Sequence, residues 1–414
     1  MIMETTRYNI QMLSNGLRII HLPSASPVVY CGYGICAGTR NEDAGEEGLA
    51  HFCEHVTFKG TARRTSMQIL NRLESVGGDL NAFTNKEDTV YHCAILRDHF
   101  ARAVDLLTDI VFHSTYPQAE IDKEIEVICD EIESYNDSPA ELIFDEFENA
   151  IFEGHPLGHN ILGTAERLRG YTTDHALRFT GRFYRPENAV FFVYGNVDFK
   201  KVVRTVEAAT GDLPAAVPLY AQASASTLPA YIPCRMEIDK GTHQAHVMTG
   251  CRTFGVNDDR RMPLYLLNNM LGGPAMSARL NIVLRERNAL VYSADSSMVN
   301  YSDTGVWCAY FGCDTEDVDK CLRLVRRELD RVMHKPLSDA QLARAKRQIK
   351  GQIGVACDNR ESFALSFAKS FLHYGRVRDI SKLFRDIDMV TPGQIQDVAC
   401  QLFGGDNLTT LIFK

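Results

Sequence analysis

Two histidines four residues apart, His51 and His55, with Glu54 beside the second, form the clearest chemical signal in the sequence. On a helix that turns by about 100° per residue, the three side chains project within an arc of about 100°. Two imidazoles at this spacing can bind one metal ion, and the carboxylate can accept a proton from the water that the metal activates. The pattern therefore predicts a zinc site, against the alternative of a merely solvated polar helix face.

A catalytic zinc site needs a third protein ligand, and an acidic helix predicted over 120–135 can supply one. Isoleucines at helical spacing mark the apolar face of this segment. Glu124 and Glu131 are seven residues apart, so both lie on one side of the helix and flank that face. From the residues alone either carboxylate can be the ligand, and a solvated acidic helix is the competing interpretation.

The elements that must position these side chains occur twice along the chain. In each half the sequence predicts two strands and then an amphipathic helix. In the first half the strands lie over 26–40 and 89–96 and the helix over 98–112. In the second half the strands lie over 242–255 and 305–311 and the helix over 315–333. One offset, 216 residues, relates the strands of the two halves, which suggests an internal duplication. We therefore predict an α+β fold of two similar sandwich domains, each a mostly antiparallel sheet with helices on one face.

An uncharged stretch rich in Ala, Ser and Pro, residues 213–232, separates the two halves and is typical of a linker. A chain of 414 residues is also too long for one hydrophobic core. We expect a zinc-bearing domain over 1–212 and a similar domain over 233–414. The second domain should bind no zinc, because the offset places leucines opposite both histidines.

Composition excludes several other classes of protein. With 44 basic and 53 acidic residues the net charge is −9, which argues against a nucleic-acid partner. No apolar run approaches the ~18 residues of a membrane span, and the first residues lack the pattern of a signal peptide. The 12 cysteines are scattered and form no Cys-x-x-Cys pair. These features predict a cytoplasmic protein with reduced thiols and no membrane partner.

His-x-x-Glu-His is the inverted zinc motif, and the chain resembles the pitrilysin or insulinase-type metallopeptidases, family M16. It is most similar to the short, two-domain members, such as the mitochondrial processing peptidases. The resemblance implies one zinc ion per chain, held by His51, His55 and Glu131. It makes Glu54 the general base and Glu124 the carboxylate that orients a ligating imidazole.

The segment Gly-Gly-Asp-Leu-Asn-Ala-Phe-Thr at 77–84 resembles the family's edge strand. The resemblance implies that Asn81, Ala82, Phe83 and Thr84 bind the peptide substrate. An exposed strand can pair with an extended peptide through backbone hydrogen bonds, with little demand on its sequence. Without the histidines, an ordinary hairpin strand would be the preferred interpretation.

A second family signature begins at Leu-Gly-Gly-Pro-Ala-Met-Ser-Ala-Arg-Leu in the C-terminal half. The resemblance implies that Arg285 and Tyr292 face the scissile carbonyl, where hydrolysis develops negative charge. The chain departs from the family pattern at Pro274 and Ala275, and again where residues 288–289 replace a more usual Arg-Gly. These departures affect loop geometry and specificity rather than the zinc chemistry.

Together these features predict a zinc metalloendopeptidase that hydrolyses short or unfolded peptides. Longer relatives carry four such domains, so the resemblance implies that two chains assemble, with a homodimer as the simplest case. A heterodimer with an inactive relative is one alternative. Another is a non-catalytic scaffold subunit, which would predict a broken zinc motif. A purely structural zinc is disfavoured because such sites usually have four ligands and much cysteine.

Overall fold

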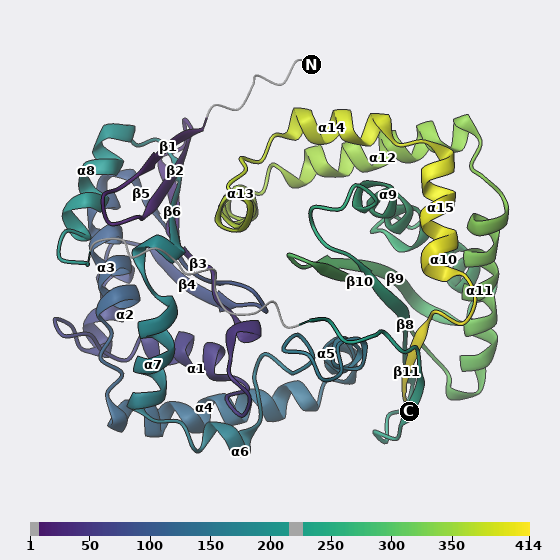
Figure 1. The fold of residues 1–414 in the computed structure, drawn as a ribbon, viewed down its shortest axis with the longest axis horizontal. Coiled ribbons are helices and arrows are strands. Elements are labelled where there is room, and N and C mark those ends of the chain that lie inside the picture. Colours follow the sequence, from purple (N-terminus) through teal and green to yellow (C-terminus); the bar gives the residue numbers. More distant parts are fainter. Residues whose placement is uncertain (1–7, 215–226) are drawn as a thin grey trace. The chain divides into compact units, whose positions relative to one another are not determined.

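The computed structural model describes residues 8–214 and 227–414, and these form two compact units (Figure 1). The first unit comprises residues up to 133, 160–227 and 356–379, and the second comprises 134–159, 228–355 and 380–414. Each unit therefore includes a segment from the other half of the sequence. Residues 215–226 of the predicted linker lie outside the described residues, so the boundaries 1–212 and 233–414 stay a prediction.

In the described part of the first unit, six strands form one sheet in the order β1-β2-β6-β3-β5-β4 (Figure 1). Its strands are β1 (Asn9–Met12), β2 (Arg18–Pro23), β3 (Val28–Ile35), β4 (Asp79–Thr84), β5 (Thr89–Leu96) and β6 (Ala189–Gly195). All neighbours are antiparallel except β2 and β6. Strand β4 lies at the edge and pairs with β5 alone, and β5 spans the predicted 89–96.

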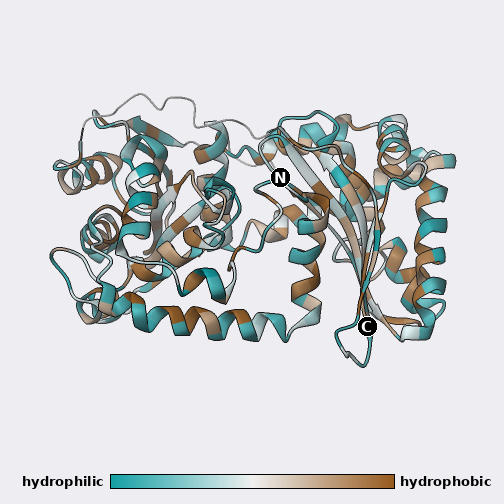
Figure 2. Cartoon of the chain, turned by 60° about the horizontal axis from the view of Figure 1, so that its bottom comes forward, coloured by the Kyte–Doolittle hydropathy of each residue, from teal (hydrophilic) through white to brown (hydrophobic). Residues whose placement is uncertain are grey.

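Helices cover the first sheet, and most of their apolar side chains join one core cluster. They are α1 (Leu49–Thr57), α2 (Ser66–Glu74), α3 (Phe100–His113), α4 (Gln118–Asn136), α6 (Ala165–Leu168), α7 (Thr173–Phe183) and α8 (Phe199–Ala209). The predicted helix over 120–135 is confirmed as α4. Hydrophilic and hydrophobic residues alternate along the ribbons of the outer helices, as expected of amphipathic helices that pack one face on a sheet (Figure 2).

A helix from the C-terminal half, α13 (Arg360–Tyr374), packs on β3 and β6 of the first sheet. Its Phe367 ring makes an edge contact with Phe192 of β6, with ring centroids 6.4 Å apart. Asp88, in the loop between β4 and β5, pairs with His373 at 3.0 Å and Lys369 at 3.1 Å, both on α13. Helices therefore pack on both faces of the first sheet. The predicted arrangement, with helices on one face only, is wrong in this respect.

In the second unit, five strands of the described chain form a sheet in the order β7-β11-β8-β10-β9. They are β7 (Arg235–Ile238), β8 (Ala245–Phe254), β9 (Val291–Asn300), β10 (Thr304–Cys313) and β11 (Thr409–Phe413). The order repeats that of β2-β6-β3-β5-β4, and here too one pair is parallel, β7 with β11. The offset of 216 residues overlays each of these five strands on its counterpart.

Helices of the second unit pack on both faces of its sheet. They are α5 (Pro139–Ile151), α9 (Arg261–Gly272), α10 (Arg279–Asn281), α11 (Val318–His334), α12 (Asp339–Ala356), α14 (Ile380–Met389) and α15 (Pro392–Phe403). Trp307 of β10 faces α15, whereas its neighbours Val306 and Cys308 join α5 in a separate apolar cluster. No helix among the described residues is long and apolar enough to cross a membrane.

Candidate metal centre

Helix α1, which carries the histidine motif, starts at a left-handed glycine and is capped by a buried carboxylate. Gly48 has φ +90°, and a Cβ there would lie 2.7 Å from the carbonyl oxygen of Leu162. The two carboxylate oxygens of Glu42 accept the backbone N–H groups of Gly48 and Ala50 at 3.0 and 2.8 Å. A negative charge at a helix N-terminus is stabilising. Sequence reasoning missed Glu42, although an acid just before a helix is a recognisable signal.

His51, His55 and Glu131 form the group that could hold a metal ion. Each offers one ligand atom, and these atoms lie within 4.8 Å of one another. The buried Nδ1 of His51 has no hydrogen-bond partner among the described residues, which would be costly unless the ring bound a ligand. Two imidazoles and a carboxylate are also a usual donor set for catalytic zinc. The group therefore fits a zinc ion, and its three members are the three ligands that the sequence analysis predicted.

The protonation of the group reflects its burial and its neighbours. Burial and, to a smaller extent, the nearby His55 lower the pKa of His51 to about 4, so the ring is neutral as a metal ligand must be. Burial also opposes charge on His55, but its hydrogen bonds to Glu124 and Glu131 outweigh burial and raise its pKa to about 9. The hydrogen bond from His55 in turn lowers the pKa of Glu131.

The carboxylate of Glu124 contacts both His55 and Lys59 and lies outside the group of three metal ligands. Its Oε1 is 3.1 Å from His55 Nδ1, and its Oε2 is 2.5 Å from Lys59 Nζ. A proton held on Nδ1 by this carboxylate leaves Nε2 as the ligating nitrogen. Burial raises the pKa of Glu124, but the partners His55 and Lys59 lower it overall. The sequence prediction placed Glu124 in this position and did not identify Lys59.

Replacing Glu124 with Gln should lower zinc affinity about 10-fold or more, because the charge that orients and polarises His55 is lost. Competition with a chromophoric chelator measures this. Glu126→Gln is the matched control, since Glu126 lies on the same helix, is largely exposed and pairs with Arg169 instead. Equal zinc affinity in the Glu124 and Glu126 variants would contradict this role of Glu124.

Glu54 is almost fully buried next to the metal group. Its Oε2 accepts a hydrogen bond from the hydroxyl of Thr84, the last residue of β4, at 2.8 Å. Burial raises the pKa of Glu54, and the bond from Thr84 partly opposes this. Thr84 was predicted to bind substrate, and its side chain is committed to Glu54. The other three residues of that prediction lie on the same edge strand, β4.

The predicted polar face of α1 is less open than a helical wheel suggests. Every residue of α1 except His55 is buried, including His51 and Glu54, because other elements cover that side as well.

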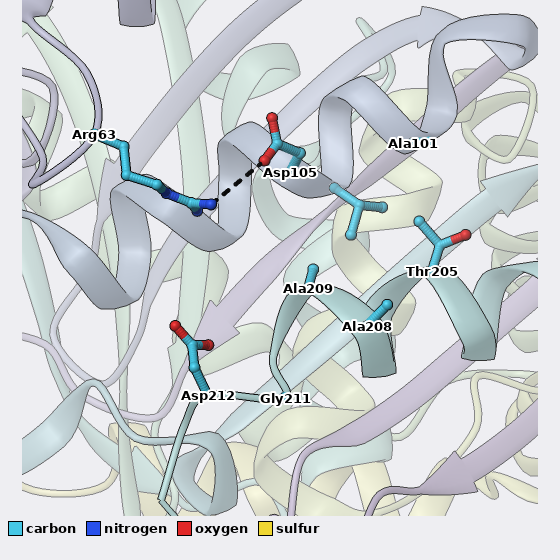
Figure 3. Close-up of a pocket in the computed structure, with 9 residues that line it drawn as sticks. Arg63, Ala101, Asp105, Thr205, Ala208, Ala209, Gly211 and Asp212 are labelled. Atoms are coloured by element: carbon cyan, nitrogen blue, oxygen red, sulfur yellow. Dashed lines mark ion pairs between the residues drawn. The ribbon is translucent and has the colours of Figure 1, made fainter.

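A hollow of about 400 Å³ between α3 and α8 shares no residue with the metal group (Figure 3). Its charged residues are paired, Arg63 with Asp105 and Asp212 with His113.

Arg285 and Tyr292 belong to the second unit, and their side chains lie together there. The guanidinium carbon of Arg285 is 5.6 Å from the centroid of the Tyr292 ring, and Tyr292 is 86% exposed. Arg285 lies in a π-helical turn, η4 (Ile282–Glu286), and such turns are frequent at functional sites. Ala289, which follows, has φ +50°, so it adopts a conformation that favours the glycine usual in the family.

Replacing Ala289 with Gly should stabilise the protein by up to about 1 kcal/mol, because a Cβ in the left-handed region is strained. Ala343→Gly, in the interior of α12, is the control and should destabilise by about 1 kcal/mol. Urea unfolding of both variants measures the two changes. A loss of stability in the Ala289 variant as large as in the control would show that the Ala289 backbone stores no such strain.

Family models match most of the chain. The model of the insulinase family, peptidase family M16, matches residues 19–165, and that of the M16 inactive domain matches 171–349. An uncharacterized zinc protease of Streptomyces coelicolor is 34% identical over 400 residues, which cover 95% of this chain and 86% of that protein. Another, of Bacillus subtilis, is 31% identical over 408 residues, covering 98% and 97%. The chain therefore belongs to the insulinase family of peptidases, as the sequence motifs predicted.

Solved structures share the fold along the whole chain. A protease from Helicobacter pylori superimposes with a TM-score of 0.88 at 20% identity, covering 99% of this chain and 100% of that one. A putative M16-like peptidase from Alicyclobacillus acidocaldarius gives a TM-score of 0.86 at 19% identity, covering 100% and 99%. These similarities confirm the predicted fold class.

Proposed function

We propose that this protein is a zinc-dependent endopeptidase that hydrolyses bonds in short or unfolded peptides. The observation that carries the proposal is the close group of His51, His55 and Glu131, with Glu54 beside it on α1. Three protein ligands leave coordination positions open, which is typical of catalytic rather than structural zinc. The names of the zinc protease relatives support the same metal. One ion per chain follows, since the described residues hold one such group.

Each side chain of the site has a separate task in hydrolysis. When bound, zinc supplies a Lewis acid that acidifies water and polarises the peptide carbonyl. Glu54 accepts the proton of the attacking water on a carboxylate oxygen and then delivers it to the departing amine. Glu124 keeps the proton of His55 on Nδ1, so that the ring keeps its orientation.

The peptide binds as an added strand along the edge of β4. Strand β4 has no second neighbour among the described strands, and Ala82 directs its backbone groups to the free edge. Asn81 and Phe83, one residue to either side, direct their backbone groups to β5 and contribute to peptide binding through their side chains. The N–H of Ala82 donates to Asn81 Oδ1 at 2.8 Å, so an incoming peptide carbonyl must replace that bond. Binding through the backbone favours extended, unfolded peptides over folded proteins.

Arg285 and Tyr292 act on the carbonyl of the substrate, where they stabilise the developing negative charge. We place this pair at the zinc site of a second copy of the chain, because longer family members combine four such domains and this chain resembles two of them. A homodimer suffices, since one chain carries both the metal group and the Arg/Tyr pair. A heterodimer with an inactive relative is the alternative assembly.

The proposal is tested by incubating the purified protein with a peptide library and identifying the cleaved bonds by mass spectrometry. Cleavage should stop when a chelator removes the metal and should return with one equivalent of Zn²⁺ per chain. Cleavage that persists in the metal-free protein would contradict the zinc mechanism. A protein that binds zinc at the group and cleaves no peptide would instead be the non-catalytic scaffold.

A further inference from the structure

The last residue of the edge strand β4 touches the catalytic carboxylate rather than the free edge. We propose that Thr84 is a positioning residue, whose hydroxyl holds one oxygen of Glu54 and ties the general base to the strand that receives the peptide. This inference rests on the proposed function. It assigns Thr84 a role different from the substrate contact that its place in the edge-strand motif implies.

The direction of the Thr84 side chain follows from strand alternation. Thr84, Ala82 and Leu80 share one face of β4, and the last two pack on the core of the first unit. Phe83 points to the opposite face, where its ring centroid is 5.8 Å from that of His92 and 5.1 Å from Lys369 Nζ. The Thr84 hydroxyl therefore faces α1, away from Phe83 and its neighbours.

The hydrogen bond between Thr84 and the carboxylate of Glu54 is buried, and it is the one hydrogen bond that this carboxylate makes among the described residues. Both residues are 8% exposed, and the Oγ1 of Thr84 donates to Glu54 Oε2 at 2.8 Å. A carboxylate whose one oxygen is held cannot turn freely about its last torsion, so the other oxygen keeps a fixed direction.

The Thr84 end of β4 is itself firmly held. Thr84 pairs in register with Thr89 of β5, next to the turn that joins the two strands. In the turn between them the side chain of Asn85 donates to Asp88 at 2.7 Å, and Asp88 is paired with α13. A hydroxyl on such an anchored strand end can define the position of a base.

Loss of this hydroxyl should affect the chemical step and spare binding. With Oε2 released, the Glu54 carboxylate samples other orientations and meets the attacking water less often in the right geometry. Peptide affinity should not change, because the backbone groups of β4 stay in place. Zinc should also remain bound, because neither Thr84 nor Glu54 belongs to the group of three ligands.

The experiment compares Thr84→Val, Thr84→Ser and Thr89→Val with the wild type on a peptide from the library. Thr89→Val is the matched control, because it removes a neighbouring buried threonine hydroxyl that does not contact Glu54. The readouts are kcat, KM, zinc content, melting temperature and the Kd of the peptide for the metal-free proteins. We expect Thr84→Val to lower kcat about 10- to 100-fold, with KM, Kd and zinc content within about twofold of wild type.

Two further results complete the expectation. Thr84→Ser should recover most of the rate, since serine keeps the donor, and Thr89→Val should lower the melting temperature while keeping kcat. A rise in KM and Kd with unchanged kcat would overturn the inference and make Thr84 a substrate contact. Equal losses of kcat in Thr84→Val and Thr89→Val would also overturn it. A zinc-loaded wild type that cleaves no peptide would overturn the proposed function, and this inference with it.

Discussion

Replacing Glu54 with Gln is expected to lower kcat about 10³-fold or more, while the protein keeps its zinc. Gln cannot accept the proton of the attacking water, but its carbonyl oxygen can still accept the hydrogen bond of Thr84, so the local fold is kept. The measurements are single-peptide kinetics and metal content on the same preparation. Near wild-type activity in this variant would rule out Glu54 as the general base.

Glu131→Gln provides the contrast to this variant. Glu131 belongs to the metal group, whereas Glu54 does not, so its neutral substitute should weaken zinc binding and lower activity through loss of the metal. Excess Zn²⁺ should then restore part of the activity of Glu131→Gln and none of that of Glu54→Gln. The same response of both variants to added zinc would contradict the separate roles assigned to the two carboxylates.

Replacing Arg285 with Ala is expected to lower kcat about 10²- to 10³-fold, because a donor to the developing oxyanion is lost. If the pair acts on the partner's zinc site, mixing Arg285→Ala with Glu54→Gln protein should restore activity. The hybrid dimer then combines an intact zinc site from one chain with an intact Arg/Tyr pair from the other. Random exchange should recover about a quarter of wild-type activity, since half of the dimers are hybrids with one working site.

The control for this mixture combines Glu54→Gln with Glu131→Gln. Both changes damage the zinc site itself, so each hybrid dimer has two defective sites and no activity should return. Subunit exchange is verified by mass spectrometry of differently labelled chains. Absence of recovery in the Arg285 mixture, with exchange proven, would place Arg285 at the zinc site of its own chain or outside the reaction.

The sequence could predict those parts of the site that local spacing controls. Helical spacing alone brings His51, Glu54 and His55 to one side of α1. It could not decide between Glu124 and Glu131, since both flank the same side of α4, and the choice came from the family resemblance. The structure separates them, because Glu131 lies within the metal group and Glu124 behind His55.

Contacts between distant segments could not be predicted from one sequence. Lys59 follows α1 as an ordinary helix-ending lysine, and nothing in its surroundings indicates that it pairs with Glu124. Thr84 is separated from Glu54 by 30 residues, and only the packing of β4 beside α1 brings the two together. Strand and helix patterns likewise predict β5 and α4 but not which sheet face α13 covers, because periodicity describes one element at a time.

The exchange of equivalent helices between the two units has a consequence for synthesis on the ribosome. The offset of 216 residues relates α5 to α13, and each belongs to the unit built mainly from the other half. Helix α13 packs on the face of the sheet that carries Phe192, and it emerges only after most of the chain has been synthesised. The N-terminal half therefore cannot reach its final state as a nascent chain, and a fragment that ends before residue 360 should be prone to aggregation. Each half of the sequence therefore supplies a helix that the other half needs to complete its unit.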